Sequence, residues 1–250
     1  MEQEHILAVL DIRKSFRHVR ALRGVSLQVR RGSITAIVGD NGSGKSTLIK
    51  IISGNLQPDG GSLWIDGKEY RRLDIRTAMD CGVRTVYQDL ALDNFKNSIE
   101  NIFLGSEITA GPFLNRRAMA EEAKRLLEKI RVEIPDMQEP VRNLSGGQRQ
   151  GIAIARALRH PGKLLLLDEP TAAMGIQESH SAIHMLERLR DQGMTLLIVS
   201  HNLHQVFHMA DYIYILRAGL CMGGVATRDT SLESLQEMIL REESEKEADL

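Results

Sequence analysis

The stretch of this sequence that most restricts its fold is "GDNGSGKS" at residues 39–46. It matches the pattern G-x-x-x-x-G-K-[S/T], in which glycines let successive backbone N–H groups surround a phosphate chain. The apolar run 33–39, "SITAIVG", precedes it and is typical of a buried strand that stops at a glycine. A helix is expected to follow from Lys45 to Ser53. The pattern therefore lies at a strand-to-helix turn, where a helix N-terminus can bind phosphate.

Two side chains of this segment carry the expected chemistry. Lys45 would reach the β- and γ-phosphates of a nucleotide, and the Ser46 hydroxyl would ligate Mg²⁺. An ordinary glycine-rich turn is the alternative, but such a turn needs neither the strand before the pattern nor the helix after it. The predicted phosphate-binding residues are Gly39, Asp40, Asn41, Gly42, Ser43, Gly44, Lys45, Ser46 and Thr47.

A second motif, "LLLLDEP" at residues 164–170, runs four leucines into two adjacent acids. A strand-terminal acid beside a phosphate-binding loop can hold Mg²⁺, and an adjacent acid can orient or deprotonate the attacking water. We therefore predict that Asp168 is the metal residue and Glu169 the general base. The alternative is that the two acids only cap the next helix, but two idle carboxylates after buried leucines would be costly.

The remaining pattern predicts an α/β domain, because strands that alternate with helices form parallel sheets. Further strands are expected at 62–66, 82–88, 163–168, 195–200 and 212–216, and helices at 145–159, 176–192 and 202–210. Residues 89–143 change character and carry a helical stripe, which indicates an inserted helical subdomain. The expected division is a nucleotide-binding core of residues 1–88 and 144–225, the insertion 89–143, and a C-terminal helix with a frayed tail over residues 226–250.

Composition restricts the cellular location and the binding partners expected for the chain. No apolar run approaches the roughly 18 residues that a membrane-spanning helix requires, so we expect a cytosolic or peripherally attached protein. The net charge of −1 provides no bulk attraction to nucleic acid, and no nucleic-acid partner is expected. Cys81 and Cys221 lack metal-ligand spacing.

A third motif, "LSGGQ" at residues 144–148, opens the helix expected at 145–159. Ser145 and Gln148 have the spacing of a capping box, in which each side chain bonds to the backbone N–H of the other residue. Capping alone does not explain Gly146 and Gly147. The two glycines leave the helix N-terminus bare enough for an anion to approach.

The motifs "GDNGSGKS", "LSGGQRQ", "LLLLDEP" and "VSH" (199–201), in this order, resemble the nucleotide-binding subunit of ATP-binding cassette (ABC) transporters over about residues 5–225. The resemblance implies a P-loop NTPase core with a mainly parallel sheet and an N-terminal antiparallel β subdomain. It implies ATP and Mg²⁺ as ligands, and a homodimer in which Ser145, Gly146, Gly147 and Gln148 meet the γ-phosphate of ATP held by the second copy. It also implies transmembrane permease subunits that contact residues 88–143, an indirect link to a periplasmic binding protein, and a place at the cytoplasmic face of the inner membrane.

Three single residues take roles from the same resemblance. Gln88 corresponds to the glutamine that approaches Mg²⁺ and the membrane subunit. His201 corresponds to the histidine that contacts the γ-phosphate, and Phe16 to the aromatic ring that stacks on adenine. Without the surrounding motifs, an ordinary strand-end glutamine, a structural histidine and a core phenylalanine would be the alternatives.

The segment after Glu169 bears on the cargo. Cassettes of this family commonly have an interface aspartate where the aligned residues here are Ala173, Met174 and Gly175, so no acid is present. The sequence after Glu169, without this acid, resembles that of the cassettes of bacterial simple-sugar importers of the ribose, xylose and fructose type. The alternative is that Gly175 is a neutral departure without bearing on the cargo.

Other functions stay open at this point. They are an importer ATPase for another small solute, a non-transport cassette ATPase, and a nucleotide-binding regulator that does not hydrolyse ATP. The regulator is disfavoured because Lys45, Glu169 and His201 are all present.

Overall fold

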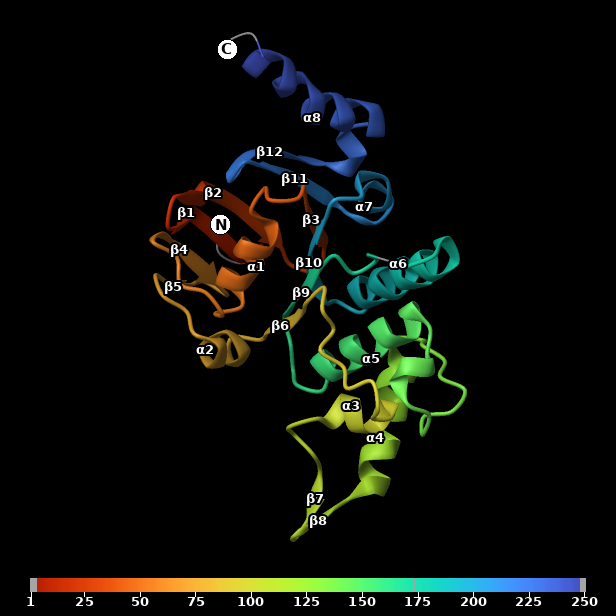
Figure 1. The fold of residues 1–250 in the computed structure, drawn as a ribbon. Helices are drawn as coiled ribbons and strands as arrows, with labels where there is room; N and C mark the ends of the chain where they lie inside the picture. The colour runs from red at the N-terminus through yellow and green to blue at the C-terminus, as the bar shows by residue number, and fades with distance from the viewer. Residues whose placement is uncertain (1–3, 173, 248–250) are drawn as a thin grey trace.

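The computed structural model describes residues 4–172 and 174–247, and its centre is a six-stranded sheet (Figure 1). In sheet order the strands are β12 (Leu220–Ala226), β11 (Tyr212–Arg217), β3 (Ile34–Val38), β10 (Thr195–Ser200), β9 (Leu164–Asp168) and β6 (Val83–Val86). All neighbouring pairs are parallel except β11 and β12. The predicted mainly parallel α/β fold is confirmed.

The central strands are buried on both faces, which explains their unbroken apolar sequences. In β9, Leu164 and Leu166 pack into one core cluster, while Leu165 and Leu167 pack into the other. Successive side chains of a strand point to opposite faces, so four consecutive leucines fill both layers. Asp168 ends this strand at the edge where the parallel strands have their carboxyl ends.

A second, antiparallel sheet covers one face of the domain. It has the order β2 (Val19–Arg30), β1 (His5–Phe16), β4 (Gly60–Ile65) and β5 (Lys68–Tyr70). Its buried side chains share a core cluster with α1 (Lys45–Ile52) and with one face of β9 and β10. Helix α1 therefore lies between the two sheets, and the expected N-terminal antiparallel subdomain is present.

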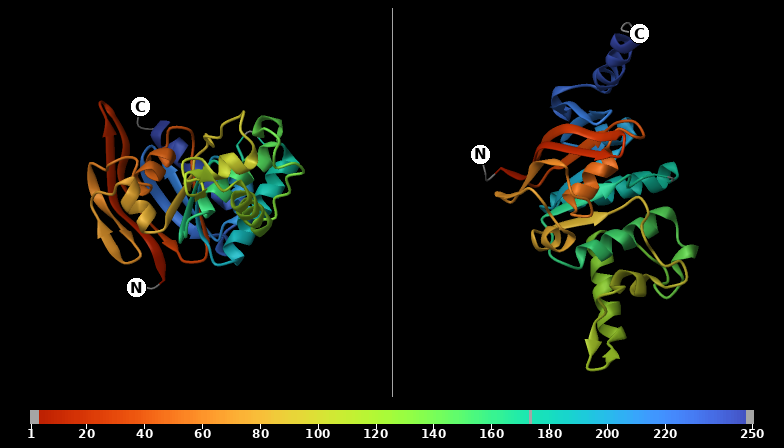
Figure 2. Two further views of the ribbon diagram at one scale, coloured as in Figure 1. Left: turned by 90° about the horizontal axis from the view of Figure 1, so that it is seen from below. Right: turned by 60° about the vertical axis from the view of Figure 1, so that its left-hand side comes forward.

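Helices cover the other face of the six-stranded sheet. Helices α5 (Gly146–Leu158), α6 (Ile176–Asp191) and α7 (Leu203–Met209) lie on the sheet, and α3 (Ser98–Phe103) and α4 (Arg116–Lys129) pack against α5. Figure 2 shows a small hairpin at one end of the molecule and α8 (Leu232–Glu247) at the other. The hairpin joins β7 (Thr109–Ala110) to β8 (Phe113–Leu114).

The structure departs from the predicted elements in several places. The strand expected at 82–88 ends at Val86, so Gln88 lies in a loop. The sequence did not predict α2 (Ile75–Asp80), β12 or the β7–β8 hairpin. Strand β12 contains Gly223 and Gly224, which weaken strand propensity, and its pairing with β11 decides its conformation.

The C-terminal segment is more helical than expected. Helix α8 continues to Glu247, so the tail predicted to be frayed is helical over residues 241–247, and residues 248–250 lie outside the described chain. Leu235 is fully buried and anchors this helix, and the glutamates and lysine beyond it are good helix formers. Within residues 4–172 and 174–247, no helix combines the length and the apolar character needed to cross a lipid bilayer.

Candidate functional site

The predicted phosphate-binding loop joins β3 to α1 and is pressed against its neighbours at two glycines. A Cβ atom on Gly44, which has φ +108°, would lie 2.6 Å from the Ala21 carbonyl oxygen of β2. A Cβ atom on Gly39 would lie 2.0 Å from the Leu216 carbonyl oxygen of β11. Gly42 has φ +85° and no atom within 4 Å of its Cβ position among the described residues. The loop is therefore closed against both sheets and open at Gly42, where a phosphate chain can approach.

Lys45 is the first residue of α1 and folds back over the loop. Its Nζ atom donates hydrogen bonds to the Gly39 carbonyl at 2.6 Å and to the Asp40 carbonyl at 2.9 Å. Burial lowers the pKa of Lys45, and nearby carboxylates, Glu169 first among them, act in the opposite direction. A buried cation with only neutral carbonyl partners can exchange them for phosphate oxygens.

Ser46 and Asp168 come together from elements that are 122 residues apart in the chain. The Ser46 hydroxyl donates to Asp168 Oδ1 at 3.2 Å. Burial raises the pKa of Asp168, and the hydrogen bond from Ser46 opposes that shift. The described residues contain no cluster of three or more His, Cys, Asp or Glu side chains that could hold a metal. A hard cation would therefore need this hydroxyl and carboxylate together with oxygens from the nucleotide or water, which is the donor set that suits Mg²⁺.

Glu169 and His201 lie side by side because β9 and β10 are neighbouring parallel strands. Glu169 Oε2 is 2.9 Å from His201 Nδ1. The Glu169 backbone has φ +50°, and its N–H donates to the Val199 carbonyl at 2.9 Å. The Glu169 side chain is 9% exposed and that of His201 is 57% exposed. The left-handed backbone at Glu169 turns this side chain out of the strand direction toward the histidine.

Gln88 and the turn of residues 145–148, called the signature turn below, approach Glu169 from the face of the sheet that the helices cover. Gln88, Gly146 and Glu169 line one cavity of about 320 Å³. Arg149 and Gln150 also line it, and Gln150 Nε2 is buried without a hydrogen-bond partner in the described part of the chain. The sequence prediction missed both residues, although they directly follow the LSGGQ motif.

The predicted capping box of α5 is confirmed. Gln148 N–H donates to Ser145 Oγ at 3.3 Å, and Ser145 N–H donates to Gln148 Oε1 at 3.0 Å. Gly146 and Gly147 follow the cap without side chains, and Ser145, Gly147 and Gln148 line a separate cavity of about 620 Å³ against α6. The P-loop and this turn lie on helices that pack against opposite faces of the six-stranded sheet.

Phe16 ends β1 with an exposed ring, so the alternative of a core phenylalanine is wrong. Lys14 Nζ lies 5.7 Å from the ring centroid and forms an ion pair with Asp59 at 2.7 Å. The Ser15 N–H donates to the same carboxylate at 2.7 Å. The strand end that carries the ring is therefore braced, and the ring stays open to solvent.

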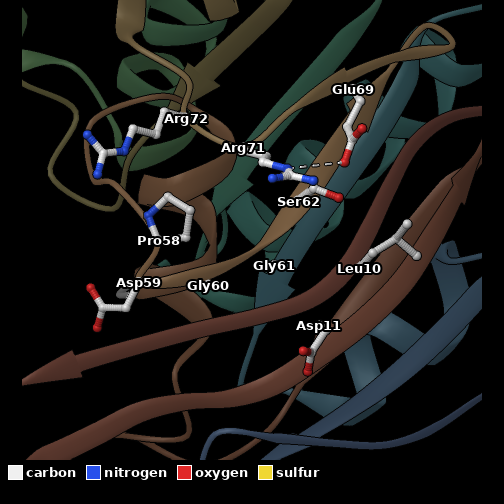
Figure 3. A pocket seen from close by; sticks show the side chains of 10 residues that line it. All are labelled: Leu10, Asp11, Pro58, Asp59, Gly60, Gly61, Ser62, Glu69, Arg71 and Arg72. Carbon is white, nitrogen blue, oxygen red and sulfur yellow. Dashed lines mark ion pairs between the residues drawn. The ribbon is translucent and has the colours of Figure 1, made fainter.

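A hollow of about 550 Å³ lies on the antiparallel sheet next to this brace (Figure 3). Asp59 is on its rim, Arg71 reaches toward Glu69 at 3.9 Å, and Arg72 points away from that pair. None of the predicted site residues lines this hollow. We assign the candidate site to the edge formed by the P-loop, Asp168, Glu169 and His201.

The segment after Glu169 leads into the N-terminus of α6. Gly175 is the N-cap residue of α6, and its N–H donates to Glu178 Oε2 at 3.2 Å. Ala173 lies outside the described residues. The sequence prediction missed Glu178, although the three-residue spacing from Gly175 to Glu178 is that of a capping box.

Comparisons with known proteins agree with this arrangement. A family model described as "ABC transporter" matches residues 22–172. The xylose/arabinose import ATP-binding protein of Sulfolobus acidocaldarius is 42% identical over 94% of this chain and 93% of its own length. The fructose import ATP-binding protein of Rhizobium meliloti is 38% identical over 89% of each chain.

Solved structures show the same fold. An ATP-binding cassette determined as a dimer in a post-hydrolysis state with ADP and phosphate superposes with a TM-score of 0.77 at 25% identity. The match covers 89% of this chain and 99% of that structure.

Proposed function

The chain belongs to the ABC transporter family of ATP-binding proteins, and from this premise we propose that it is the ATP-hydrolysing subunit of a monosaccharide importer. The observation that supports this most is the meeting of four side chains at one sheet edge. Ser46 contacts Asp168, and Glu169 contacts His201, at the carboxyl ends of adjacent parallel strands. This edge is where open α/β sheets bind their ligands.

ATP binding is assigned to residues 39–47, with Phe16 as the adenine platform. The open side at Gly42 admits the phosphates, and Lys45 exchanges its carbonyl partners for β- and γ-phosphate oxygens. The exposed Phe16 ring is assigned to stacking on the adenine base. Asp59 and Lys14 brace the strand end that presents this ring. The backbone N–H groups and Lys45 then stabilise the negative charge that develops during hydrolysis.

The Ser46 hydroxyl and the Asp168 carboxylate fit Mg²⁺, and Gln88 is assigned to the same cation. When bound, Mg²⁺ would neutralise negative charge on the phosphates of the nucleotide. Asp168 holds its carboxylate at that point because β9 ends there, and Ser46 keeps one of its oxygens oriented.

Glu169 is assigned as the general base that aligns water with the γ-phosphorus atom. His201 lies within hydrogen-bond distance of the Glu169 carboxylate and restricts its orientation. His201 is also the more exposed of the two, so its ring can reach the γ-phosphate from the open side. A carboxylate positioned in this way contributes by orienting the nucleophile before the phosphoryl transfer.

A second copy of the chain completes the site in this proposal. In the turn of residues 145–148, Gly146 and Gly147 carry no side chains of their own, and the turn lies apart from the P-loop of the same chain. Such a helix start binds anions, so the turn is assigned to the γ-phosphate of the ATP on the partner copy. The related cassette with ADP and phosphate was itself determined as a dimer.

The proposal also includes a membrane partner and a transported sugar. Residues 88–143 are assigned to the contact with permease subunits at the cytoplasmic face of the membrane, and a binding protein outside delivers the sugar to them. The relatives named above import xylose, arabinose or fructose by their descriptions. The absence of an acid at Gly175 supports the same subgroup.

Steady-state phosphate release by the purified chain tests the ATPase assignment. Glu169→Gln should lower kcat by about 100-fold or more, because it removes the base. ATP binding should remain within about twofold of the wild type. An unchanged rate of phosphate release would show that Glu169 is not the base.

A thermal-shift screen tests the cargo. The binding protein encoded beside this chain should gain stability with a pentose or hexose, because a ligand that binds only the folded state raises Tm. Stabilisation by amino acids or metal ions and not by sugars would replace the sugar assignment with another small solute.

A further inference from the structure

The first turns of α5 and α6 meet, and one carboxylate lies between them. Glu178 Oε2 accepts a hydrogen bond from the Gly175 N–H at 3.2 Å. A Cβ atom on Gly146 would lie 3.3 Å from the same Oε2 atom, and a Cβ atom on Gly147 would lie 3.9 Å from the Glu178 Cβ. The Glu178 side chain therefore lies beside both glycines, on the side where their Cβ atoms would be, while it caps α6.

The charges at this meeting point favour a carboxylate. The N-terminus of a helix carries a partial positive charge, and α5 has no acidic residue in its first turn. Gly175 has no side chain that could cap α6, and among the described residues Glu178 supplies the side-chain bond at this helix start. The Glu178 carboxylate thus caps α6 and lies beside the start of α5.

We propose that Glu178 is a positioning residue that links the segment after Glu169 to the signature turn within one subunit. By holding that turn in place, it affects hydrolysis at the ATP site that the turn completes. The inference rests on the proposed function, because that function assigns the signature turn to the ATP of the second copy.

Between Glu169 and Glu178, three described residues are hydrogen-bonded to neighbouring groups. The Glu169 N–H is bonded to the Val199 carbonyl at 2.9 Å. The Thr171 hydroxyl donates to Gln205 Oε1 at 2.6 Å. Glu178 holds the far end at Gly175 and contacts the signature turn. The described ends of this stretch are therefore tied to β10 and to the signature turn.

Three variants of the full chain separate this role from general stability. Glu178→Ala removes the acceptor for the Gly175 N–H. Glu178→Gln keeps an oxygen acceptor in nearly the same place and removes the charge. Glu187→Ala is the matched control, since Glu187 is on the same helix and pairs with His184 instead. Each variant is measured for phosphate release against ATP concentration and for amide hydrogen exchange at residues 145–148 without nucleotide.

We expect the hydrolysis rate to fall while the apparent affinity for ATP stays nearly unchanged. Glu178→Ala should lower kcat by about fivefold or more and bring the Hill coefficient toward 1, with the KM for ATP changed by less than about twofold. Amide exchange at residues 145–148 should rise in the same variant. Glu178→Gln should restore at least about half of the wild-type kcat, because an amide oxygen also accepts the Gly175 bond. Glu187→Ala should match the wild type.

Two outcomes overturn the inference. One is wild-type kcat and cooperativity in Glu178→Ala. The other is an equal loss in Glu178→Gln and Glu178→Ala, since a positioning hydrogen bond would be rescued by the amide. If the wild-type chain itself released no phosphate, the proposed function would fail instead, and the exchange rates at residues 145–148 would still test the contact.

Discussion

Asp168 is a carboxylate that the fold holds in an unfavourable environment. It ends a strand in which Leu164 to Leu167 are fully buried, and burial raises its pKa above the ordinary aspartate value. A carboxyl group with a pKa raised by folding stabilises the fold only at low pH, and this contribution is lost as pH rises through the folded-state pKa. At neutral pH Asp168 therefore lowers the stability of the nucleotide-free protein, because its pKa is raised in the folded state.

We predict that Asp168→Asn stabilises the nucleotide-free protein and abolishes ATP hydrolysis. The amide keeps an oxygen for the Ser46 bond and removes the buried charge, so Tm should rise by roughly 2–4 °C near neutral pH. The gain should disappear near pH 3, below the ordinary aspartate pKa, where the wild-type carboxyl is protonated in both states. Thermal unfolding at both pH values measures this. A variant less stable than the wild type at neutral pH would contradict the pKa direction.

Helix α5 connects the signature turn to the loop that carries Gln88. Arg156, near its C-terminal end, donates to the Ala91 carbonyl at 2.8 Å and to the Leu90 carbonyl at 2.5 Å. Ala91 has φ +48°, a left-handed backbone that a residue with a side chain seldom adopts. Burial also lowers the pKa of Arg156, so the guanidinium is partly desolvated while it holds this loop.

We predict that Arg156→Met releases the loop from α5. Methionine keeps the apolar stem but leaves two carbonyl groups without their charged donor, which should lower the free energy of unfolding by about 2 kcal/mol. Amide exchange at residues 88–94 should rise, and stimulation of ATP hydrolysis by the permease should fall. Arg125→Met is the control, because Arg125 lies exposed on α4 and pairs with Glu122. Unchanged exchange at residues 88–94 would exclude this clamp.

In the whole molecule, a single chain holds two half-sites that are separated by the central sheet. The P-loop belongs to the core layer with the antiparallel sheet, and the signature turn belongs to the helical layer. Gly175 lies between Glu169 and the start of α6, with φ −66° and no described atom within 4 Å of its Cβ position. An acid therefore fits there without a clash with the described residues.

We predict that Gly175→Asp changes coupling between two ATP sites more than nucleotide affinity. The Hill coefficient for ATP hydrolysis should shift, while the Kd for ATP stays within about twofold. Stability should change little, since aspartate and glycine differ by only a few tenths of a kcal/mol at an N-cap. Titration with a fluorescent ATP analogue and phosphate-release assays provide the two measurements. A large loss of ATP binding with unchanged cooperativity would refute the prediction.

The sequence by itself determined the features that depend on neighbours along the chain. The glycines of the P-loop, the Ser145 and Gln148 cap, and the leucines of β9 each follow from local backbone or burial requirements within a few residues. The mainly parallel sheet followed from the alternation of strands and helices. These features were predictable because their physical causes are short-range.

Only the tertiary structure decided which distant groups meet. The contact of Ser46 with Asp168, the left-handed turn that brings Glu169 to His201, and the carboxylate of Glu178 between two helix starts join segments that sequence spacing does not relate. Strand β12 exists because β11 pairs with it, against the low strand propensity of its glycines. Long-range pairing and packing outweigh local preference at such places, because the buried area and hydrogen bonds they gain exceed the small differences in propensity.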